Sequence, residues 1–497
     1  NWHNIFEESP YAKQDENSET SSQTPGDGRD KWNFGDINEW RNFAYVDGDK
    51  TRLIVGVNSK KFSSLFEFEK IAVKHQAKIV NTVSIKGEVR ALVFELLWVS
   101  VSAFVEEVRV AGLASYVEPN MKVQAQFVPN DPYWSWQWGP QMIEADWAWN
   151  TTIGDHSTLV AVVDTGVYYT HSDLAANYVA LGYDWVNNDN DPIDDHGHGT
   201  HCAGIIAAVL NNGVGIAGLA QVQVMAEKVL TSGGGGYAEW IANGIIHATD
   251  CGADIISMSL GGYGDSELIH EAVKYAYDSG VLVIAAAGND NTNMKLYPAA
   301  YDEVVAVAAT DQFDDKAWFS NWGDWIELAA PGVSIYSTVP WGYESWSGTS
   351  MACPHVSGVA ALVWSRYPSK TRDWVRLWLR FTADDLGDPG FDVYYGYGRV
   401  NARKAVEQAS LAHELIVCDW ATPPYVEPGD LATINATVLN FGENNETDVT
   451  VQLFANDTMV DSTMIGFLAC GNSAEVNLLW SPAAEGLYNV TLYVVPV

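Results

Sequence analysis

The sequence is poor in cysteine and in basic side chains, and it contains no long apolar run. Five cysteines in 497 residues are too few for a disulfide scaffold, although Cys418 and Cys470 can pair with each other. The chain has 27 basic and 63 acidic residues, which gives a net charge of −36. This charge argues against nucleic acid as a partner, because phosphate binding needs clustered cations. No apolar run reaches the roughly 18 residues that a membrane-spanning helix requires, so no membrane span is predicted.

The remaining composition indicates folded domains. Apolar residues make up 47% of the chain and aromatic residues 12%, which is typical of packed cores. A chain of this length is expected to hold about three domains. Changes in composition predict an acidic, disordered lead-in, a small α+β domain, a large α/β domain and a β-sandwich, at residues 1–36, 37–126, 127–410 and 411–497.

The second segment predicts a ferredoxin-like fold. Its alternation of strand and helix patterns follows the order βαββαβ within about 75 residues, which is the order of that fold. The predicted strands cover residues 52–57, 78–85 and 89–97 and a segment centred on Tyr116, and the predicted helices cover residues 63–76 and 99–111.

The third segment predicts a parallel sheet with helices on both faces, because short apolar strands alternate with helical patterns. These strands are expected at residues 159–163, 222–228, 255–259, 281–287 and 304–308. Active sites in such sheets lie at the carboxyl ends of the strands. The last segment alternates apolar and polar residues between turns, and we predict strands of a β-sandwich at residues 433–439, 449–454, 474–480 and 488–494.

Three short motifs carry chemistry. Asp164 ends a predicted strand and precedes a tight turn, His198 opens a His-Gly-Thr-His segment, and Ser350 lies at the start of an apolar helix. A serine hydroxyl needs a base to take its proton, and a histidine oriented by a carboxylate supplies that base. The order Asp, His, Ser along the chain is the order found in subtilisin.

Residues 128–409 resemble the subtilisin-like serine proteases, and the thermitase branch in particular. Besides the three motifs, the resemblance includes Pro129-Asn130-Asp131-Pro132-Tyr133, Gly139-Pro140-Gln141 and Gly398-Arg399-Val400-Asn401-Ala402. It implies a serine endopeptidase of broad specificity that cleaves polypeptides through an acyl-enzyme. It also implies secretion, and the start of the sequence at Asn1 is compatible with a removed signal peptide. A monomer is expected.

The resemblance implies further site residues. Asn289 would donate its side-chain amide to the oxyanion, together with the backbone N–H of Ser350. An extended substrate would pair with the segment Ser259, Leu260 and Gly261, while Gly288 would line the specificity pocket. Asp290 suggests the hypothesis that this pocket accepts basic side chains.

Two oxygen-rich regions are predicted to bind structural Ca²⁺, a hard cation that prefers carboxylate and carbonyl ligands. Thermitase-like enzymes hold calcium in loops at both places. The first set of ligands is Asp131, Asp173, Val209, Asn212, Val214 and Ile216. The second set is Asp184, Asp189 and Asp191, with Asn187 as a weaker ligand. A solvated acidic loop is the alternative for each.

The resemblance also assigns roles outside the α/β domain. The βαββαβ segment would be an inhibitory propeptide, whose tail at residues 120–127 occupies the cleft until the chain cuts itself near Gln126-Phe127. Cys202 lies one helical turn beyond His198, and we expect mercurials to inhibit by modifying it. The sandwich looks like an adhesion-type module, and its four N-glycosylation sequons at Asn435, Asn445, Asn456 and Asn489 suggest a surface exposed outside the cell.

Two other functions are compatible with parts of the sequence. A surface protein can retain a protease scaffold without activity, but such relatives usually lose at least one of Asp164, His198, Asn289 and Ser350. The acid-acting serine-carboxyl peptidases share the fold and a Gly-Thr-Ser serine, but they replace the histidine base with glutamate. His198 in its motif therefore argues against that second alternative.

Overall fold

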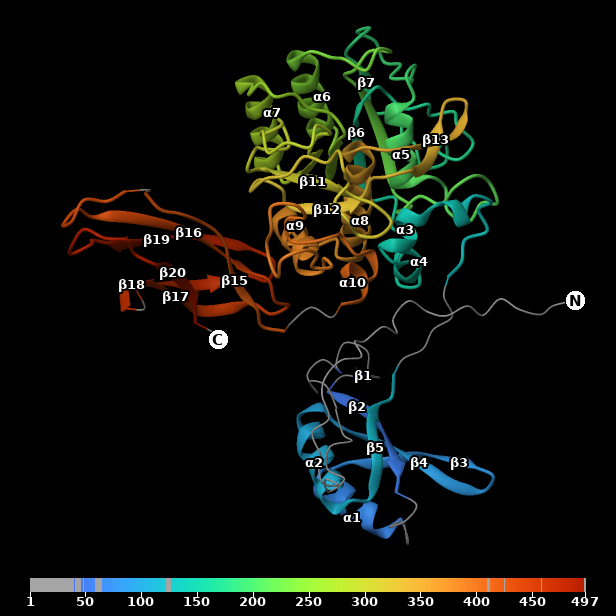
Figure 1. Cartoon of the computed structure of the whole chain (residues 1–497), viewed down its shortest axis with the longest axis vertical. Coiled ribbons are helices and arrows are strands. Elements are labelled where there is room, and N and C mark those ends of the chain that lie inside the picture. Colours follow the sequence, from blue (N-terminus) through green and yellow to red (C-terminus); the bar gives the residue numbers. More distant parts are fainter. Residues whose placement is uncertain are drawn as a thin grey trace, which may run out of the picture. The chain divides into compact units, whose positions relative to one another are not determined.

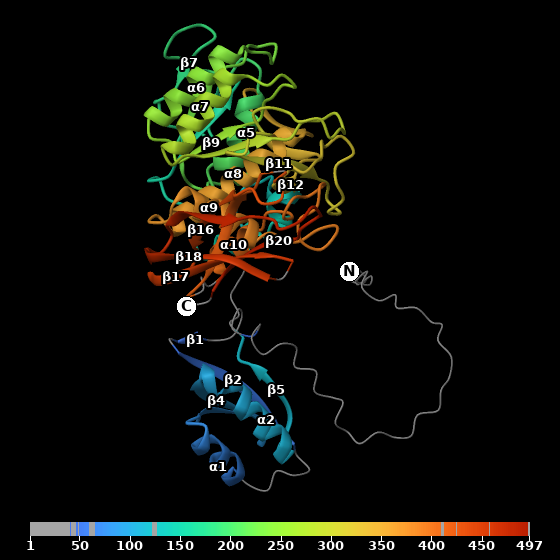
Figure 2. The same ribbon diagram turned by 90° about the vertical axis from the view of Figure 1, so that its left-hand side faces the viewer.

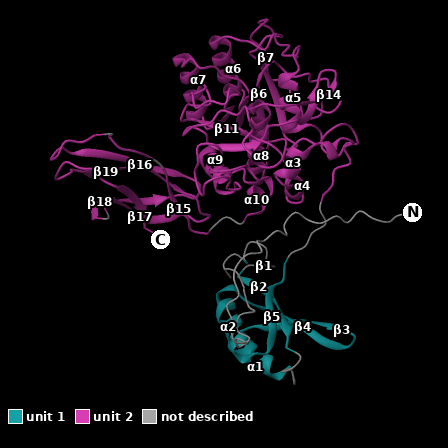
Figure 3. Ribbon diagram, in the orientation of Figure 1, with its two compact units in different colours: residues 1–124 teal, residues 125–497 magenta. Residues whose placement is uncertain are grey.

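The computed structural model describes residues 40, 46–47, 49–58, 65–121, 127–408, 412–423, 425–456 and 458–495. These residues form two compact units, residues 1–124 and residues 125–497 (Figure 3). The lead-in predicted for residues 1–36 lies outside the described residues. Among the described helices, none combines the length and the apolar character needed to cross a membrane.

The first unit has one antiparallel sheet with two helices against it, and it confirms the βαββαβ order. Leu53 of the central strand pairs with Phe94 and packs in a core with Phe68 and Phe104. The sheet order is β3-β4-β2-β5, with the two-residue strand β1 also paired to β2. The elements are β1 (Val46–Asp47), β2 (Lys50–Val57), α1 (Phe66–Lys74), β3 (Lys78–Ile85), β4 (Glu88–Leu97), a 3-10 helix (Trp98–Ser100), α2 (Val101–Ala111) and β5 (Ala114–Pro119).

The second unit is built on a seven-stranded sheet in which every pair of neighbours is parallel. The order is β12-β11-β10-β9-β6-β8-β7, so strands β6 and β9, distant in sequence, are neighbours at its centre. Figure 1 labels β6, β7, β11 and β12 of this sheet. The strands are β6 (Leu159–Asp164), β7 (Tyr183–Asp184), β8 (Gln223–Lys228), β9 (Ile255–Met258), β10 (Leu282–Ala286), β11 (Val304–Thr310) and β12 (Leu328–Pro331).

Helices cover both faces of this sheet, as its apolar strands predict. Val160 and Val162 of β6 pack in the same core as α5 and α8, whereas Ala161 and Val163 pack in the core that includes α6 and α7. The helices are α3 (Trp138–Met142), α4 (Ala145–Ala148), α5 (His198–Ala207), α6 (Ala238–Asp250), α7 (Glu267–Asp278), α8 (Thr349–Arg366), α9 (Arg372–Phe381) and α10 (Ala402–Glu407), with a 3-10 helix (Trp134–Trp136) and the hairpin β13 (Ile335–Val339) and β14 (Gly342–Trp346).

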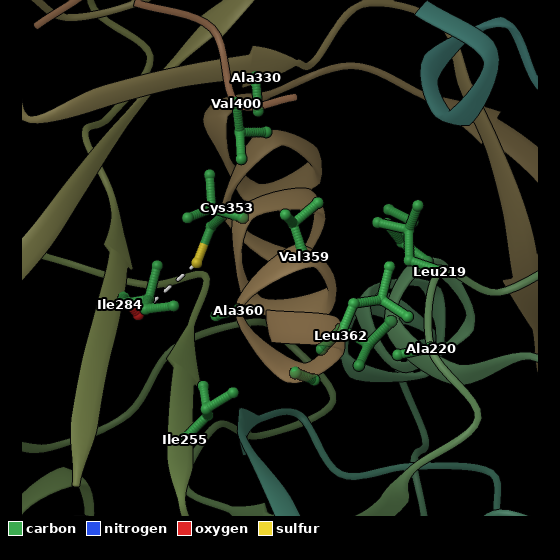
Figure 4. Close-up of a cluster of buried hydrophobic side chains, with 14 of the residues drawn as sticks. Leu219, Ala220, Ile255, Ile284, Ala330, Cys353, Val359, Ala360, Leu362 and Val400 are labelled. Atoms are coloured by element: carbon green, nitrogen blue, oxygen red, sulfur yellow. Dashed lines mark hydrogen bonds between the residues drawn. The ribbon is translucent and has the colours of Figure 1, made fainter. Parts of the chain in front are cut away.

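Helix α8 is buried along most of its length. Every residue from Thr349 to Val363 except Ser350 is buried, so this part of the helix is enclosed on all sides. Figure 4 shows Cys353, Val359 and Leu362 of this helix facing side chains from separate strands and loops. This packing fixes the start of α8, and with it Ser350, against the sheet.

The C-terminal part of the second unit is a sandwich of two three-stranded antiparallel sheets (Figure 2). One sheet has the order β15-β16-β19 and the other β18-β17-β20. Their inner faces form a separate apolar core that includes Ile434, Val451 and Leu478. The strands are β15 (Leu415–Ala421), β16 (Ala432–Asn440), β17 (Glu446–Ala455), β18 (Thr458–Leu468), β19 (Ser473–Trp480) and β20 (Val490–Val494).

The sandwich packs on helix α9 through aromatic side chains. Phe441 lies 5.5 Å from the ring of Trp374 and 5.3 Å from that of Trp378, and its carbonyl accepts a hydrogen bond from the Trp374 indole. Cys418 and Cys470 do not form a disulfide in the structure, so the pairing considered above is absent. The thiol of Cys470 instead contacts Lys370, which lies just before α9.

Candidate active site

Asp164 and His198 come together at the carboxyl end of the central strand β6. Asp164 is the last residue of that strand and is fully buried, while His198 is the first residue of helix α5. Nδ1 of His198 lies 2.7 Å from Oδ1 of Asp164. Burial lowers the pKa of His198, but the charge and hydrogen bond of Asp164 outweigh burial and hold this pKa above its ordinary value. The carboxylate therefore stabilises the imidazolium that forms when His198 accepts a proton.

Ser350 is in the first turn of α8, where backbone N–H groups have no partner within the helix. Pro354, four residues later, has no N–H, so it cannot hydrogen-bond the Ser350 carbonyl as a helical residue would. That carbonyl instead accepts hydrogen bonds from Ser259 Oγ at 2.8 Å and from Cys202 Sγ at 3.4 Å. The serine backbone is thus held by three separate elements: α8, α5 and the loop after β9.

The side chain of Asn289 has one possible orientation. Its Oδ1 accepts hydrogen bonds from the backbone N–H of Thr349 at 2.8 Å and from the Thr349 hydroxyl at 3.0 Å. A backbone N–H can only donate, so the oxygen of the amide must face Thr349 and Nδ2 must face away from it. Asn289 is exposed, and no described residue accepts a hydrogen bond from its two amide protons, so they can donate to an anion formed beside Ser350.

The Ser350 hydroxyl is turned toward the carbonyl of Ser259, at 3.3 Å. Among the described residues, His198 and Ser350 share no hydrogen bond in this state. Catalytic hydrogen bonds often become short only when substrate binds, so this arrangement is compatible with a nucleophile at rest.

A cleft of about 520 Å³ runs beside the histidine. Its walls bring together the predicted substrate segment and the predicted base, since Ser259, Leu260, Gly261 and His198 all line it. The cleft is also lined by residues 234–236, three consecutive glycines that leave room for a bound chain.

The backbone at Gly288 requires glycine. Its φ angle is +102°, and a Cβ atom there would lie 2.4 Å from Nδ2 of Asn321. Asp290, two residues later, accepts a hydrogen bond of 2.5 Å from the hydroxyl of Tyr263. The carboxylate is exposed and close to Asn289, so it can still contact a substrate side chain.

Cys202 lies beside the base, as its position one turn after His198 predicts. Its sulfur and one ligand atom each of Asp164 and His198 are all within 4.8 Å of one another. The thiol is buried, and burial raises its pKa well above the ordinary value. His201 and His355 are fully buried, and burial lowers their pKa values to about 3 and about 4.

The first predicted calcium set surrounds two buried carboxylates. Asp131 is 4% exposed and Asp173 is fully buried, and no cationic side chain in the described part of the chain pairs with either. Burial raises the pKa of Asp173 to about 6, and the neighbouring charge of Asp131 adds to the rise. The loop at residues 209–216 wraps around both carboxylates, donating backbone or side-chain N–H groups to them from Asn211, Asn212 and Ile216.

Two buried anions without a cation are costly, and a bound divalent ion would relieve that cost. Within the described residues, no N–H donates to the backbone carbonyls of Val209, Val214 or Ile216. Together with the two carboxylates, these carbonyls give an oxygen-rich donor set, whereas Asn212 presents its Nδ2 to Asp173 and its Oδ1 accepts the Val214 N–H. The residues of the first set therefore fit calcium.

The second set lies in a loop where the backbones of Asp184 and Asp189 hydrogen-bond to each other, but of its three carboxylates only that of Asp184 is buried. Both oxygens of Asp184 accept N–H groups from Val186 and Asn187, and Asp191 accepts the Tyr169 hydroxyl. Asp189 and Asp191 are exposed, so their charges are solvated, whereas Asp131 and Asp173 of the first set are both buried. This loop fits a metal ion less well than the first.

The structure adds a residue to which the sequence analysis gave no role. Asp194 is 4% exposed and lies in the loop before His198. Its carboxylate accepts five hydrogen bonds, from Thr165 Oγ1, His196 N, Gly197 N, Thr200 N and Thr200 Oγ1. In the sequence it is one acidic residue among several, and its partner Thr165 is 29 positions away.

Comparison with known proteins identifies two regions. Residues 155–398 match the subtilase family, and residues 412–497 match the family described as CARDB. The chain is 48% identical to thermitase of Thermoactinomyces vulgaris over 284 residues, which covers 56% of this chain and 100% of that protein. It is 44% identical to a thermophilic serine proteinase of Bacillus sp. (strain AK1) over 310 residues, 62% of this chain and 76% of that protein. It is also 42% identical to the halolysin-like extracellular serine protease Nep of Natrialba magadii over 299 residues, 59% of this chain and 55% of that protein.

Proposed function

The chain belongs to the subtilase family of serine endopeptidases, and we propose that it hydrolyses peptide bonds with Asp164, His198 and Ser350 as its catalytic triad. The observation that carries this proposal is the 2.7 Å contact between Asp164 and His198, on a strand end and a helix start beside Ser350. Asn289 completes the site as the oxyanion donor.

The reaction begins when Ser350 attacks the carbonyl carbon of the substrate. His198 takes the hydroxyl proton on Nε2, because its Nδ1 is held by Asp164. The negative charge that develops on the substrate oxygen is stabilised by Nδ2 of Asn289 and the backbone N–H of Ser350. His198 then protonates the leaving amine, and an ester of Ser350 remains. Water attacks this acyl-enzyme by the same steps and releases the acid.

The substrate is a polypeptide bound in extended form. The loop after β9, at Ser259 to Gly261, and residues 234–236 both line the cleft and offer backbone groups there, which supports pairing of the substrate as an added strand. Broad specificity follows if most contacts are to the substrate backbone. Asp290 would add tolerance for Lys or Arg in the specificity pocket, and a peptide library in which neither is accepted would exclude that role.

We further propose that the chain is a zymogen, with residues 37–126 as the inhibitory propeptide. The support is the ferredoxin-like fold of the first unit and its place directly before the catalytic domain. The proposed cleavage near Gln126-Phe127 lies at the edge of the described residues. N-terminal sequencing of the active enzyme tests this, and a start more than about ten residues away would contradict it.

The decisive experiment compares the chain with its Ser350→Ala variant. Loss of both peptide cleavage and self-processing supports the triad and the zymogen together. A variant that still cleaves peptides would refute the role of Ser350. A variant that loses peptide cleavage but is still processed would assign maturation to another protease.

Structural calcium is proposed for the loop around Asp131 and Asp173, because no described cationic side chain pairs with its two buried carboxylates. The ion would supply the missing positive charge, and Val209, Asn212, Val214 and Ile216 would provide the remaining oxygen ligands. The loop of Asp184, Asp189 and Asp191 stays a weaker prediction.

The enzyme is proposed to act outside the cell as a monomer. One relative is named as an extracellular protease, and the acidic surface gives no indication of a nucleic-acid partner. The CARDB-like sandwich would serve as a spacer or in adhesion to substrate.

The inactive-scaffold and serine-carboxyl alternatives are separated from this proposal by a casein plate with and without a serine-directed fluorophosphonate. Clearing near neutral pH that the reagent abolishes supports the triad. No clearing at any pH or calcium level would favour an inactive scaffold, and clearing only in acid would favour the serine-carboxyl mechanism.

A further inference from the structure

The carboxylate of Asp194 connects the end of strand β6, which carries Asp164, with the start of helix α5, which carries His198. Its Oδ1 accepts the Thr165 hydroxyl at 2.9 Å, and that hydroxyl in turn accepts the backbone N–H of Gly199 at 2.9 Å. Thr165 directly follows Asp164, and Gly199 directly follows His198. The chain Asp194–Thr165–Gly199 therefore runs parallel to the contact between Asp164 and His198.

The same carboxylate shapes the loop that leads into α5. Oδ1 also accepts the N–H groups of His196 and Gly197, at 2.9 and 2.8 Å, and Oδ2 accepts the N–H and hydroxyl of Thr200, at 2.9 and 2.5 Å. Gly197 has a φ angle of +102°, so the chain turns sharply just before the histidine. One buried side chain thus fixes the backbone on both sides of His198.

The fit between the two segments leaves little space for adjustment. A Cβ atom on Gly199 would lie 2.1 Å from the carbonyl oxygen of Gly166 and 3.1 Å from Cβ of Asp164. Helix α5 therefore approaches the turn after β6 at backbone contact distance. Loss of the tie between them would let the imidazole move relative to Asp164.

Among the described residues, no cationic side chain pairs with Asp194. All five of its partners are neutral N–H or O–H donors, whereas the nearby cation Lys228 on β8 binds the Asp195 carboxylate and the Thr165 carbonyl. The ionisable groups that face His198 are Asp164 on β6, His201 and Cys202 on α5, and Asp194 and His196 in the preceding loop. Of these, Asp164 and Asp194 are the anions, so a charge on Asp194 favours the protonated imidazole.

We propose that Asp194, acting through Thr165, is a positioning residue of the active site, which holds His198 in line with Asp164 and adds its negative charge to the field at the imidazole. This rests on the proposed triad. The carboxylate touches neither substrate nor reacting atoms, so its effect should appear in kcat and in the pH profile rather than in KM.

The test measures kcat, KM and the acid limb of the pH profile for Asp194→Asn, with enzyme concentration normalised by titration with a fluorophosphonate. We expect kcat to fall about 10- to 100-fold, the effect of a displacement of about 1 Å, with KM nearly unchanged. Because the lost charge favoured the imidazolium, the midpoint of the acid limb should move to lower pH. Reduced kcat with a shifted limb supports the proposal, and either wild-type kcat or an unshifted limb would overturn it.

Two further variants separate position from charge. Thr165→Val removes the hydroxyl link but keeps the Asp194 carboxylate, so kcat should fall without a shift of the acid limb, whereas Thr165→Ser should behave like wild type. If Asp194→Asn does not fold, this pair decides, and wild-type kcat in Thr165→Val would overturn the proposal. Asp155→Asn makes the same chemical change at an exposed carboxylate, and it should leave kcat and the pH profile unchanged.

The proposal and the triad fail in different ways. If the unmodified chain is inactive, or if Ser350→Ala still cleaves peptides, the triad itself is wrong. If both behave as expected and Asp194→Asn matches wild type, the role of Asp194 alone is wrong.

Discussion

Replacing Asn289 by leucine removes one of the two oxyanion donors and leaves the triad in place. We expect kcat to fall by about 10²- to 10³-fold, the cost of losing the corresponding donor in subtilisin, which is about 2.7 to 4 kcal/mol of transition-state stabilisation. KM should change little, because this hydrogen bond becomes strong only when the substrate carbonyl turns into an oxyanion.

Aspartate at the same position should be worse for catalysis. It retains an oxygen where Oδ1 accepts the Thr349 N–H and hydroxyl, but it places a second carboxylate oxygen where Nδ2 was. Two negative charges about 4 Å apart at an effective dielectric constant of about 20 repel by about 4 kcal/mol. We therefore expect Asn289→Asp to lose about a further 10³-fold in kcat relative to Asn289→Leu.

Stability should follow the opposite order. Leucine cannot accept the Thr349 N–H, and Thr349 is fully buried, so its unsatisfied donor should cost about 1 to 3 kcal/mol. Aspartate keeps both hydrogen bonds and should be the more stable variant. Thermal unfolding is measured in the Ser350→Ala background, where self-digestion is absent, and kcat and KM are measured on a chromogenic peptide.

The leucine variant is thus expected to be the more active of the two and the aspartate variant the more stable. If the leucine variant is less active than the aspartate variant, then Asn289 does not donate to an anion. A loss confined to KM would instead assign the residue to ground-state binding.

Three other outcomes are expected. The pKa of His198 is raised above its usual value, and the neutral imidazole is the base, so kcat/KM should increase with pH through a midpoint above about 6.5. A midpoint below that value would contradict the role of Asp164. Calcium at 100 times its dissociation constant should raise the free energy of unfolding of the Ser350→Ala chain by about 2.7 kcal/mol. Asp173→Asn should lose most of this stabilisation, while Asp155→Asn keeps it. Equal stabilisation of these two variants would exclude the first calcium site. An organomercurial should inactivate the enzyme slowly through the buried Cys202, and Cys202→Ser should be resistant; full activity of the unmodified enzyme in excess reagent would show that the thiol is not close to the base in solution.

The sequence was sufficient for the residues that carry chemistry within local motifs. Asp164, His198 and Ser350 each lie in a short segment whose neighbours also have fixed roles, and the structure brings the first two into contact. The strands around them could be predicted equally well, because strands of a parallel sheet are buried on both faces and therefore appear in the sequence as continuous apolar runs. The antiparallel first unit followed from its alternating pattern.

What the sequence did not reveal depends on distant partners or on weak patterns. Asp194 gains its importance from Thr165, 29 residues earlier, and nothing local distinguishes it from Asp195. Strand β18 was not predicted, because all but one of its described side chains lie at least partly at the surface. Its sequence therefore lacks the alternating apolar pattern that would indicate a strand. The possible Cys418–Cys470 pairing came from position alone, and sequence contains no distance between two thiols.

The aromatic contact between the sandwich and helix α9 has a practical consequence for anyone who wishes to produce the catalytic domain alone. A boundary at residue 410 suits the sequence, but it removes Phe441 from the face of Trp374 and Trp378, two indoles that are at most 1% exposed in the intact unit. Freshly uncovered aromatic surface of this kind promotes self-association. A shortened protein is therefore expected to be less soluble than the longer one, and Trp374 and Trp378 are the positions at which to redesign it.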